Sequence, residues 1–152
     1  YPASKKDYIN KKIKHREEFR PFAPAILEEE ISKYYKIKIR SPFMLIATFV
    51  KNKKKIKSIA ATLHNDLSAR VQTVSSKNNM KFYSLIRNFY KLSRIPIVLN
   101  TSFNDKGEPM VCSHIDAIKS FYKTKLDYLY LEDYLIKNTN INQKKIKKFY
   151  KI

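Results

Sequence analysis

The spacing of hydrophobic positions along the chain alternates between helical and extended patterns. Apolar residues recur every three to four positions over 79–93 (NMKFYSLIRNFYKLS), which predicts an amphipathic helix. Helices are also predicted at 4–15, 27–35 and 116–123. Strands are predicted at 43–50, 58–63, 69–75, 97–100, 126–131 and 134–136, and an extended segment at 21–26, which contains two prolines. This alternation predicts an α/β or α+β fold, with helices packed on a sheet.

The continuous apolar run FMLIATFV (43–50) is typical of a central strand that is buried on both faces. The Lys-rich segment 51–57 that follows it is expected to be a loop. Gly107 is expected to form the turn within the loop 101–108, and Ser113 or Asp116 to begin the helix at 116–123.

Composition limits the classes of site that the chain can carry. Among its 152 residues Gly107 is the single glycine, so a Gly-rich phosphate loop is excluded. Cys112 is the single cysteine, which excludes an internal disulfide and a Cys-based zinc site. Its neighbours Met110 and Val111 are apolar, so we expect a buried structural thiol. No apolar run approaches the roughly 18 residues of a membrane span, and no signal peptide opens the chain, so we expect a soluble cytoplasmic protein without membrane partners.

The formal net charge is +19, carried by 26 Lys and only 6 Arg. With abundant Ile, Asn and Tyr, this composition fits an AT-rich coding sequence, so much of the charge is compositional. The lysine runs at 51–57 and 144–151 are either solvated surface or a patch for a nucleic-acid backbone. The arginines are more informative, because a guanidinium matches phosphate and carboxylate oxygens.

A first polar cluster contains Lys14, Arg16 and Arg20, ahead of the proline-braced segment FAPAIL. If the preceding helix continues, Lys14 and Glu18 lie one turn apart, and so do Arg16 and Arg20. These cations form either ordinary salt bridges on a helix or an anion site where the helix ends.

A second polar cluster falls between two predicted strands. If this segment is extended, alternate residues share one face, which is either a ligand site or a solvent-exposed edge. Its members are His64, Asp66, Ser68, Arg70 and Gln72. His64 and Asp66 could bind a cation, but two ligands are weak evidence for a metal.

A third cluster follows the strand predicted at 97–100, and the carboxyl ends of strands favour ligands in open α/β sheets. It consists of Asn100, Thr101, Ser102 and Asn104. The alternative is a turn sequence, since Ser, Thr and Asn favour turns. Glu108 either binds a cation or caps the next segment. Together the clusters suggest an anion site that stabilises phosphate charge, and we predict no metal site in this chain.

At these clusters the chain resembles the O-carbamoyltransferase family of the nodulation-protein and antibiotic-biosynthesis type. The matching strings occur in the family's order and cover nearly the whole chain. They are INKKIKHREEFRPFAPAILEE (9–29), HNDLSARVQTV (64–74), PIVLNTSFNDKGEPMV (96–111) and DAIKSFYKTKLDYLYL (116–131).

The resemblance implies that the chain is the carboxy-terminal domain of a two-domain enzyme, with a YrdC-like fold: a twisted mixed β-sheet flanked by helices. This domain would take carbamoyl phosphate and ATP, with Mg²⁺, and form a carbamoyl-adenylate. An amino-terminal sugar-kinase-like domain, absent from this chain, would bind iron or another metal and transfer the carbamoyl group to a hydroxyl acceptor. The chain is therefore expected to be one part of a carbamoyltransferase.

By position, the resemblance implies that Lys14, Arg20 and Arg70 are the cations around the phosphates, and that Ser102 and Asn104 are the Ser-x-Asn pair at the nucleotide. The further candidates are His64, Asp66, Ser68, Asn100, Thr101 and Glu108. Leu67 and Ser68 stand where the family usually has Gly-Thr. Because Leu disfavours a positive φ, we expect that loop to differ in shape.

The domain is expected to span 1–137, followed by a basic tail at 138–152 that frays. An alternative function is a basic nucleic-acid-binding module of YrdC-like fold without carbamoyl chemistry. Nucleic acid is the less expected partner, since the lysine charge is largely compositional.

Overall fold

The computed structural model describes residues 3–139, which divide into two units. The first unit comprises Tyr1–Asp7 and Glu18–Thr101, and the second comprises Tyr8–Glu17 and Ser102–Ile152. From residue 140 on, the basic tail predicted at 138–152 lies outside the described residues. No described helix is long and apolar enough to cross a membrane.

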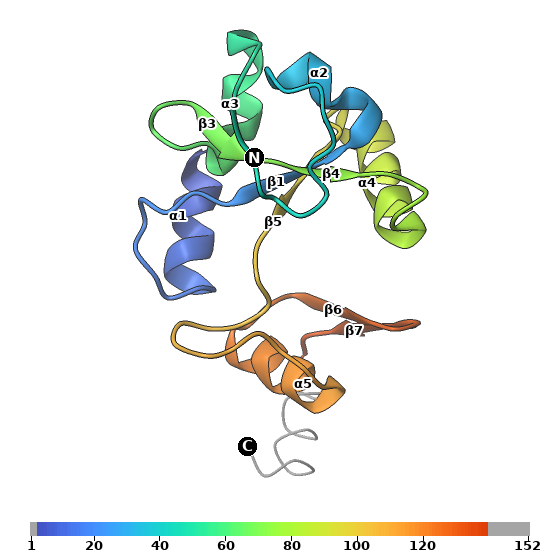
Figure 1. The fold of residues 1–152 in the computed structure, drawn as a ribbon. Helices are drawn as coiled ribbons and strands as arrows, with labels where there is room; N and C mark the ends of the chain where they lie inside the picture. Colours follow the sequence, from blue (N-terminus) through green and yellow to red (C-terminus); the bar gives the residue numbers. More distant parts are fainter. Residues whose placement is uncertain (1–2, 140–152) are drawn as a thin grey trace. The chain divides into compact units, whose positions relative to one another are not determined.

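The first unit is built around the strand β1 (Ala23–Leu27), which lies at the centre of a three-stranded sheet of order β4–β1–β5. It pairs in parallel with β4 (Gln72–Val74) and antiparallel with β5 (Ile97–Asn100). The sheet is therefore mixed, and Figure 1 shows α4 (Met80–Ser93) beside it. The extended conformation predicted for 21–26 and the strand predicted at 97–100 are confirmed.

Side chains of β1 point alternately into two hydrophobic clusters, because successive residues of a strand face opposite sides. Ala25 and Leu27 pack with Val74 and Ile86, the latter from α4. Ile26 belongs to the larger cluster on the other face, with Tyr35 and Ile97 among its members. Residues 24 to 27 of β1 are all buried, so this strand, and not the run at 43–50, is the doubly covered one.

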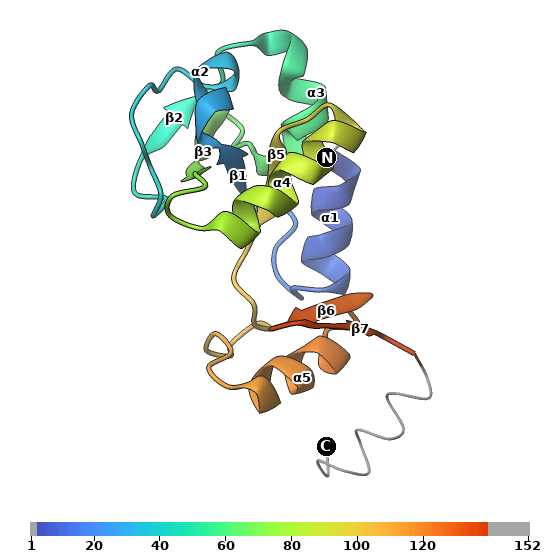
Figure 2. The ribbon, with the colours of Figure 1, turned by 90° about the vertical axis from the view of Figure 1, so that its right-hand side faces the viewer.

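The prediction of a buried central strand over 43–50 is wrong. Strand β2 covers only Ala47–Phe49 and pairs antiparallel with β3 (Ser68–Arg70) in a separate two-stranded sheet (Figure 2). Phe43 and Leu45 are 78% and 84% exposed, respectively. Apolar composition indicated burial, but the unit covers only one face of this segment.

Two further strand predictions need correction. Residues 58–63, predicted as a strand, are helical, with α3 at Ile56–Ile59 and a 3₁₀ turn at Ala60–Thr62. Another 3₁₀ turn, Lys53–Lys55, occupies the expected loop 51–57. The strand predicted at 69–75 is divided at Val71 between β3 and β4, which belong to different sheets. Val71 and Thr73 are both buried.

The predicted helix at 79–93 is confirmed as α4. The Asn79 side chain accepts a 3.0 Å hydrogen bond from Phe82 N, an N-cap that stabilises the first turn. Leu85 and Leu92, which the spacing places on the apolar face, are instead exposed. The helix ends at Arg94, which has a left-handed φ of 60°. The helix predicted at 27–35 is present as a 3₁₀ turn, Glu28–Glu30, continued by α2 (Ile31–Tyr34).

Helix α1 (Ala3–Lys12) confirms most of the prediction at 4–15, but it ends at Lys12, and His15 has a positive φ of 47°. Lys14, Arg16 and Arg20 therefore do not share a helix, and the one-turn spacing expected of them is absent.

The second unit contains α5 (His114–Lys123) and the antiparallel hairpin of β6 (Tyr128–Leu131) with β7 (Tyr134–Lys137). Ser113 and Asp116 form a capping box, so Ser113 is the residue that begins α5. Both strands and the helix were predicted within a few residues. With the mixed sheet of the first unit, they confirm the α/β class.

Candidate functional site

Lys14, Ser102 and Asn104 come together in the second unit. Lys14 follows the end of α1 and is only 6% exposed, which is unusual for a lysine. Its Nζ donates to the backbone oxygen of Ser102 at 2.9 Å and to Oδ1 of Asn104 at 2.8 Å. The carbonyl of Asn104 lies at 2.5 Å and the Ser102 hydroxyl at 3.5 Å. Residues almost ninety positions apart thus share one buried ammonium.

Further hydrogen bonds hold the loop around the ammonium in place. The Ser102 hydroxyl donates to Asn104 Oδ1 at 2.6 Å, and the amide of Asn104 donates to the Glu108 carbonyl at 2.7 Å. Phe103 O accepts from Val111 N at 3.1 Å. Every Ser102 and Asn104 side-chain group therefore has a partner in the loop or in Lys14, which gives the loop a defined shape.

Asp105 is a functional candidate that the sequence patterns did not single out. It is 7% exposed and accepts a 2.8 Å hydrogen bond from His15 Nδ1 and a 2.7 Å bond from Lys106 N. Lys123 Nζ is 3.4 Å from its other oxygen. Burial alone would raise the pKa of Asp105, but the hydrogen bonds from His15 and Lys106 outweigh it and hold the pKa below its ordinary value of 3.8.

The electrostatic environment of Lys14 is mixed. Burial lowers the pKa of its ammonium from the ordinary 10.5, the charge of Arg16 lowers it further, and Asp105 opposes both. Arg16 is oriented by a 2.7 Å hydrogen bond from its Nε to Oδ1 of Asn10, which is fully buried. The loop thus surrounds a cation whose charge is only partly offset.

The other predicted cations, Arg20 and Arg70, belong to the first unit, and both are exposed. Arg70 lies on β3, opposite Ala47 of β2. In the same unit Asn100 Nδ2 donates to Gln72 Oε1 at 2.7 Å and lies 3.7 Å from Met44 Sδ. Thr101 is exposed after β5.

The alternating polar face expected over 64–72 is not formed, because residues 64–67 make a turn. Leu67 N donates to His64 O at 2.9 Å, and Asp66 Oδ1 accepts from Ser68 N at 2.9 Å. Leu67 has a φ of 66°, in the region that favours glycine, so the loop has the positive φ that we expected Leu to disfavour. Its side chain packs against the larger core cluster, which holds this backbone conformation.

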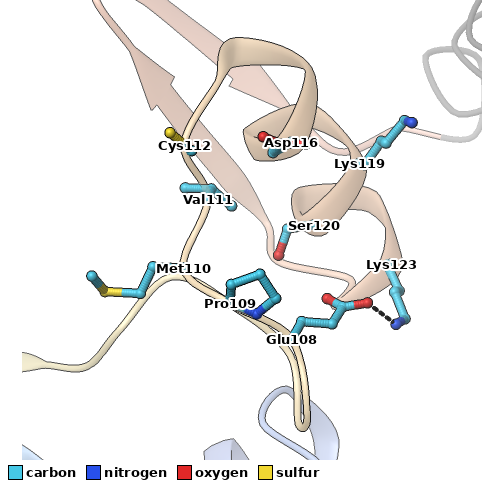
Figure 3. A pocket seen from close by; sticks show the side chains of 9 residues that line it. All are labelled: Glu108, Pro109, Met110, Val111, Cys112, Asp116, Lys119, Ser120 and Lys123. Atoms are coloured by element: carbon cyan, nitrogen blue, oxygen red, sulfur yellow. Dashed lines mark hydrogen bonds and ion pairs between the residues drawn. The ribbon is translucent and has the colours of Figure 1, made fainter.

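Glu108 lines a cavity of about 430 Å³ in the second unit, with Pro109, Met110 and Val111 on the same wall (Figure 3). Its carboxylate pairs with Lys123 at 2.5 Å. The expectation of a buried Cys112 is wrong: Cys112 is exposed and lines this cavity, and its apolar neighbour Met110 is also 66% exposed, so neither side chain belongs to a buried core. Among residues 3–139, no three His, Cys, Asp or Glu side chains gather in a way that could hold a metal ion.

Residues 2–138 match the family model described as carbamoyltransferase C-terminus. The chain belongs to this family. The resemblance drawn from the four sequence strings is thereby confirmed.

Curated relatives agree with this assignment. Nodulation protein NolNO of Sinorhizobium fredii is 42% identical over 139 residues, which are 90% of this chain and 20% of that protein. The 3′-hydroxymethylcephem-O-carbamoyltransferase of Amycolatopsis lactamdurans is 32% identical over 78% of the chain and 22% of its own length. The uncharacterized protein MJ1051 of Methanocaldococcus jannaschii is 48% identical over 86% of the chain and 25% of its own length. The chain thus spans about a fifth to a quarter of these relatives.

Proposed function

We propose that this chain is the part of an O-carbamoyltransferase that binds carbamoyl phosphate and ATP and forms a carbamoyl-adenylate. Family membership supports the carbamoyl chemistry, as does the relative named as an O-carbamoyltransferase. The single observation that carries the assignment of a site is the buried Lys14 ammonium, which gathers Ser102 and Asn104 around it. Burying a charge is costly unless hydrogen-bond partners surround it, and Ser102 and Asn104 supply these partners to Lys14.

The proposed reaction brings anions together. Water hydrolyses carbamoyl phosphate to carbamate and inorganic phosphate, and an oxygen of the carbamate then attacks the α-phosphorus of ATP as pyrophosphate leaves. Positive charge is needed to offset the repulsion between the carbamate and the phosphates. Positioning and charge then supply most of the catalysis, as is usual for reactions at phosphorus.

Lys14 has two proposed tasks in this site. Its three N–H donors already face oxygens of Ser102 and Asn104, so it orders the loop before a ligand arrives. A phosphate oxygen would replace one of these acceptors in the bound state, and the ammonium charge would then act on the ligand directly. Ser102 and Asn104, released from each other, would donate to the nucleotide.

Arg20 and Arg70 are proposed as further phosphate-binding cations on the basis of their match to the family strings. His64, Asp66, Ser68, Asn100, Thr101 and Glu108 stay candidates of lower rank. Mg²⁺ is proposed to accompany the ATP phosphates. A separate amino-terminal sugar-kinase-like domain, with its own iron or other metal, would deliver the carbamoyl group to a hydroxyl acceptor.

The test is to incubate the chain with carbamoyl phosphate, ATP and Mg²⁺, to follow pyrophosphate release, and to measure each ligand's affinity by calorimetry. Lys14→Met should weaken carbamoyl phosphate or ATP binding by about tenfold or more, equivalent to about 1.4 kcal/mol. Arg20→Ala and Arg70→Ala should each weaken phosphate binding, and Ser102→Ala and Asn104→Ala should weaken ATP binding.

Lys12→Met is the matched control, because Lys12 is exposed at the end of α1, two residues before Lys14. It removes one positive charge close in sequence to Lys14 and should leave both affinities unchanged. Thermal unfolding of each variant, followed by circular dichroism, separates lost binding from lost folding. If the wild-type chain binds neither ligand and releases no pyrophosphate, the proposal is wrong.

A further inference from the structure

The two-stranded sheet β2–β3 has one buried and one solvent-facing side. Directly opposite residues of antiparallel strands lie on the same face. Thr48 and Ala69 are such a pair, and both are buried against the unit. The pairs on the other face are Ala47 with Arg70 and Phe49 with Ser68. Ala47, Phe49 and Arg70 are exposed, so this face is open to solvent.

An apolar row occupies this solvent-facing side. Residues 45–50 alternate between outward and inward side chains, and the outward ones are Leu45, Ala47 and Phe49. Leu45 is 84% exposed, Phe49 is 49% exposed, and Phe43, just before the row, is 78% exposed. Large apolar side chains gathered in this way mark an interaction surface on a soluble domain.

The chain that leads into the row is held in place. Thr73 N donates to Ser41 O at 3.0 Å, and Gln72 Nε2 donates to Pro42 O at 3.1 Å. Met44 has a positive φ of 58°, which costs a non-glycine residue about 1 kcal/mol. The backbone is thus hydrogen-bonded just before Phe43 and has a fixed turn at Met44, so Phe43 and Leu45 face solvent in a defined position.

Cations border the apolar row. Arg70 lies directly across from Ala47, and Lys36 Nζ is 5.9 Å from the centre of the Phe49 ring. A surface that fits this face is therefore an apolar hollow bordered by carboxylates. Arg70 is also one of the proposed phosphate-binding cations.

We propose that the row Leu45–Ala47–Phe49, with Phe43 beside it, is the surface on which the amino-terminal transfer domain docks. This rests on the proposed function, which requires such a domain. The relatives quoted above have the length for such a domain, since the chain spans only 20–25% of them. Docking here places Arg70 at the boundary with the domain that receives the carbamoyl group.

The experiment measures whether a covering domain protects the row. This chain is fused behind the amino-terminal part of MJ1051, in place of that protein's own matching segment. In a Cys112→Ser background, one thiol is introduced as Leu45→Cys and, in a separate protein, as Leu92→Cys. Leu92 is 88% exposed on α4, away from the row, and is the matched control.

Maleimide labelling of the Leu45→Cys protein should slow by about tenfold or more in the fusion compared with the 152-residue chain alone, while the Leu92→Cys rate stays the same. Equal rates at position 45 in both proteins would overturn the proposal. A second outcome would also overturn the proposal: position 45 of the chain alone becomes more protected as concentration rises, and sedimentation velocity shows dimers. The row would then be an interface with a second copy.

Labelling needs no ligand and no turnover, so its result is separate from that of the pyrophosphate assay. A protected row with no pyrophosphate release would retain the docking surface and reject the chemistry. An unprotected row in a chain that releases pyrophosphate would reject the docking surface and retain the chemistry.

Discussion

Lys14 and Asp105 are the charged side chains that are buried among residues 3–139. The sequence does not reveal this burial, because the two residues are far apart and each lies in a polar segment. The contrast with the remaining lysines is physical: an exposed ammonium is hydrated, whereas Lys14 has exchanged water for oxygens of Ser102 and Asn104. The proposed site therefore rests on the burial and hydrogen bonding of one lysine and not on the total charge.

Asp105→Asn should destabilise the chain by about 1–3 kcal/mol at neutral pH, because hydrogen bonds to a charged acceptor are lost or weakened. The pKa of Asp105 is lower in the folded state than the ordinary 3.8 of the unfolded chain. The stabilisation by its carboxylate is therefore complete above pH 3.8 and is lost as the pH falls through the folded-state pKa. The difference in unfolding free energy between wild type and variant should therefore shrink from about pH 7 to about pH 3. Urea unfolding at both pH values measures it.

Glu132→Gln is the control for this pH series, since Glu132 is exposed in the hairpin turn. It should change the unfolding free energy by less than about 0.5 kcal/mol at either pH. A constant difference between wild type and Asp105→Asn across the range would show that the carboxylate is not a stabilising charge.

At the scale of elements, strand identity depends on what lies above and below each segment. APAIL in β1 contains a proline and two alanines, yet it is the buried central strand. FMLIATFV is more apolar and yet supplies a three-residue strand with an open face. β1 is covered because α4 lies on one side and the cluster around Ile26 on the other. The apolar composition of a segment does not specify which elements cover it.

Arg94→Gly should stabilise the first unit by about 0.5–1 kcal/mol. Arg94 ends α4 with a φ of 60°, and a glycine there removes the clash between Cβ and the backbone. Glycine also raises the entropy of the unfolded chain, but this cost offsets only part of the gain. Its N–H still donates to Tyr90 O at 2.9 Å, so the last turn is retained. Thermal or urea unfolding followed by circular dichroism provides the measurement.

The matched comparison is Arg87→Gly, in the middle of the same helix and also exposed. The same change of residue should there cost about 1 kcal/mol, because glycine adds backbone freedom without relieving strain. If both variants lose stability to the same degree, the left-handed geometry at Arg94 is not a source of strain.

At the scale of the whole molecule, a net charge of +19 on 152 residues produces self-repulsion. Raising sodium chloride from about 0.02 M to about 0.3 M shortens the screening length from roughly 20 Å to roughly 6 Å. The unfolding midpoint should therefore rise with salt. A midpoint that falls would mean that attractive ion pairs, such as Arg40 with Glu28 at 3.0 Å, outweigh the repulsion.

Local patterns were sufficient for features that neighbouring residues decide. Short-range spacing and hydrogen bonding account for the helix α4, the start of α5 at Ser113, the turn at Gly107 and the hairpin strands. The polar loop after β5 was also evident, because Ser and Asn follow a strand end there. Family membership was readable from the same strings.

Long-range packing settled the features that these patterns missed. Residues far apart in the chain decide three features: which strand is central, which face of β2 is open to solvent, and how Lys14 contacts Ser102 and Asn104. Burial is a property of the assembled neighbours and not of the side chain that is buried. The sequence therefore predicted a set of residues for an anion site, and the folded chain determined that Ser102 and Asn104 meet around the Lys14 ammonium.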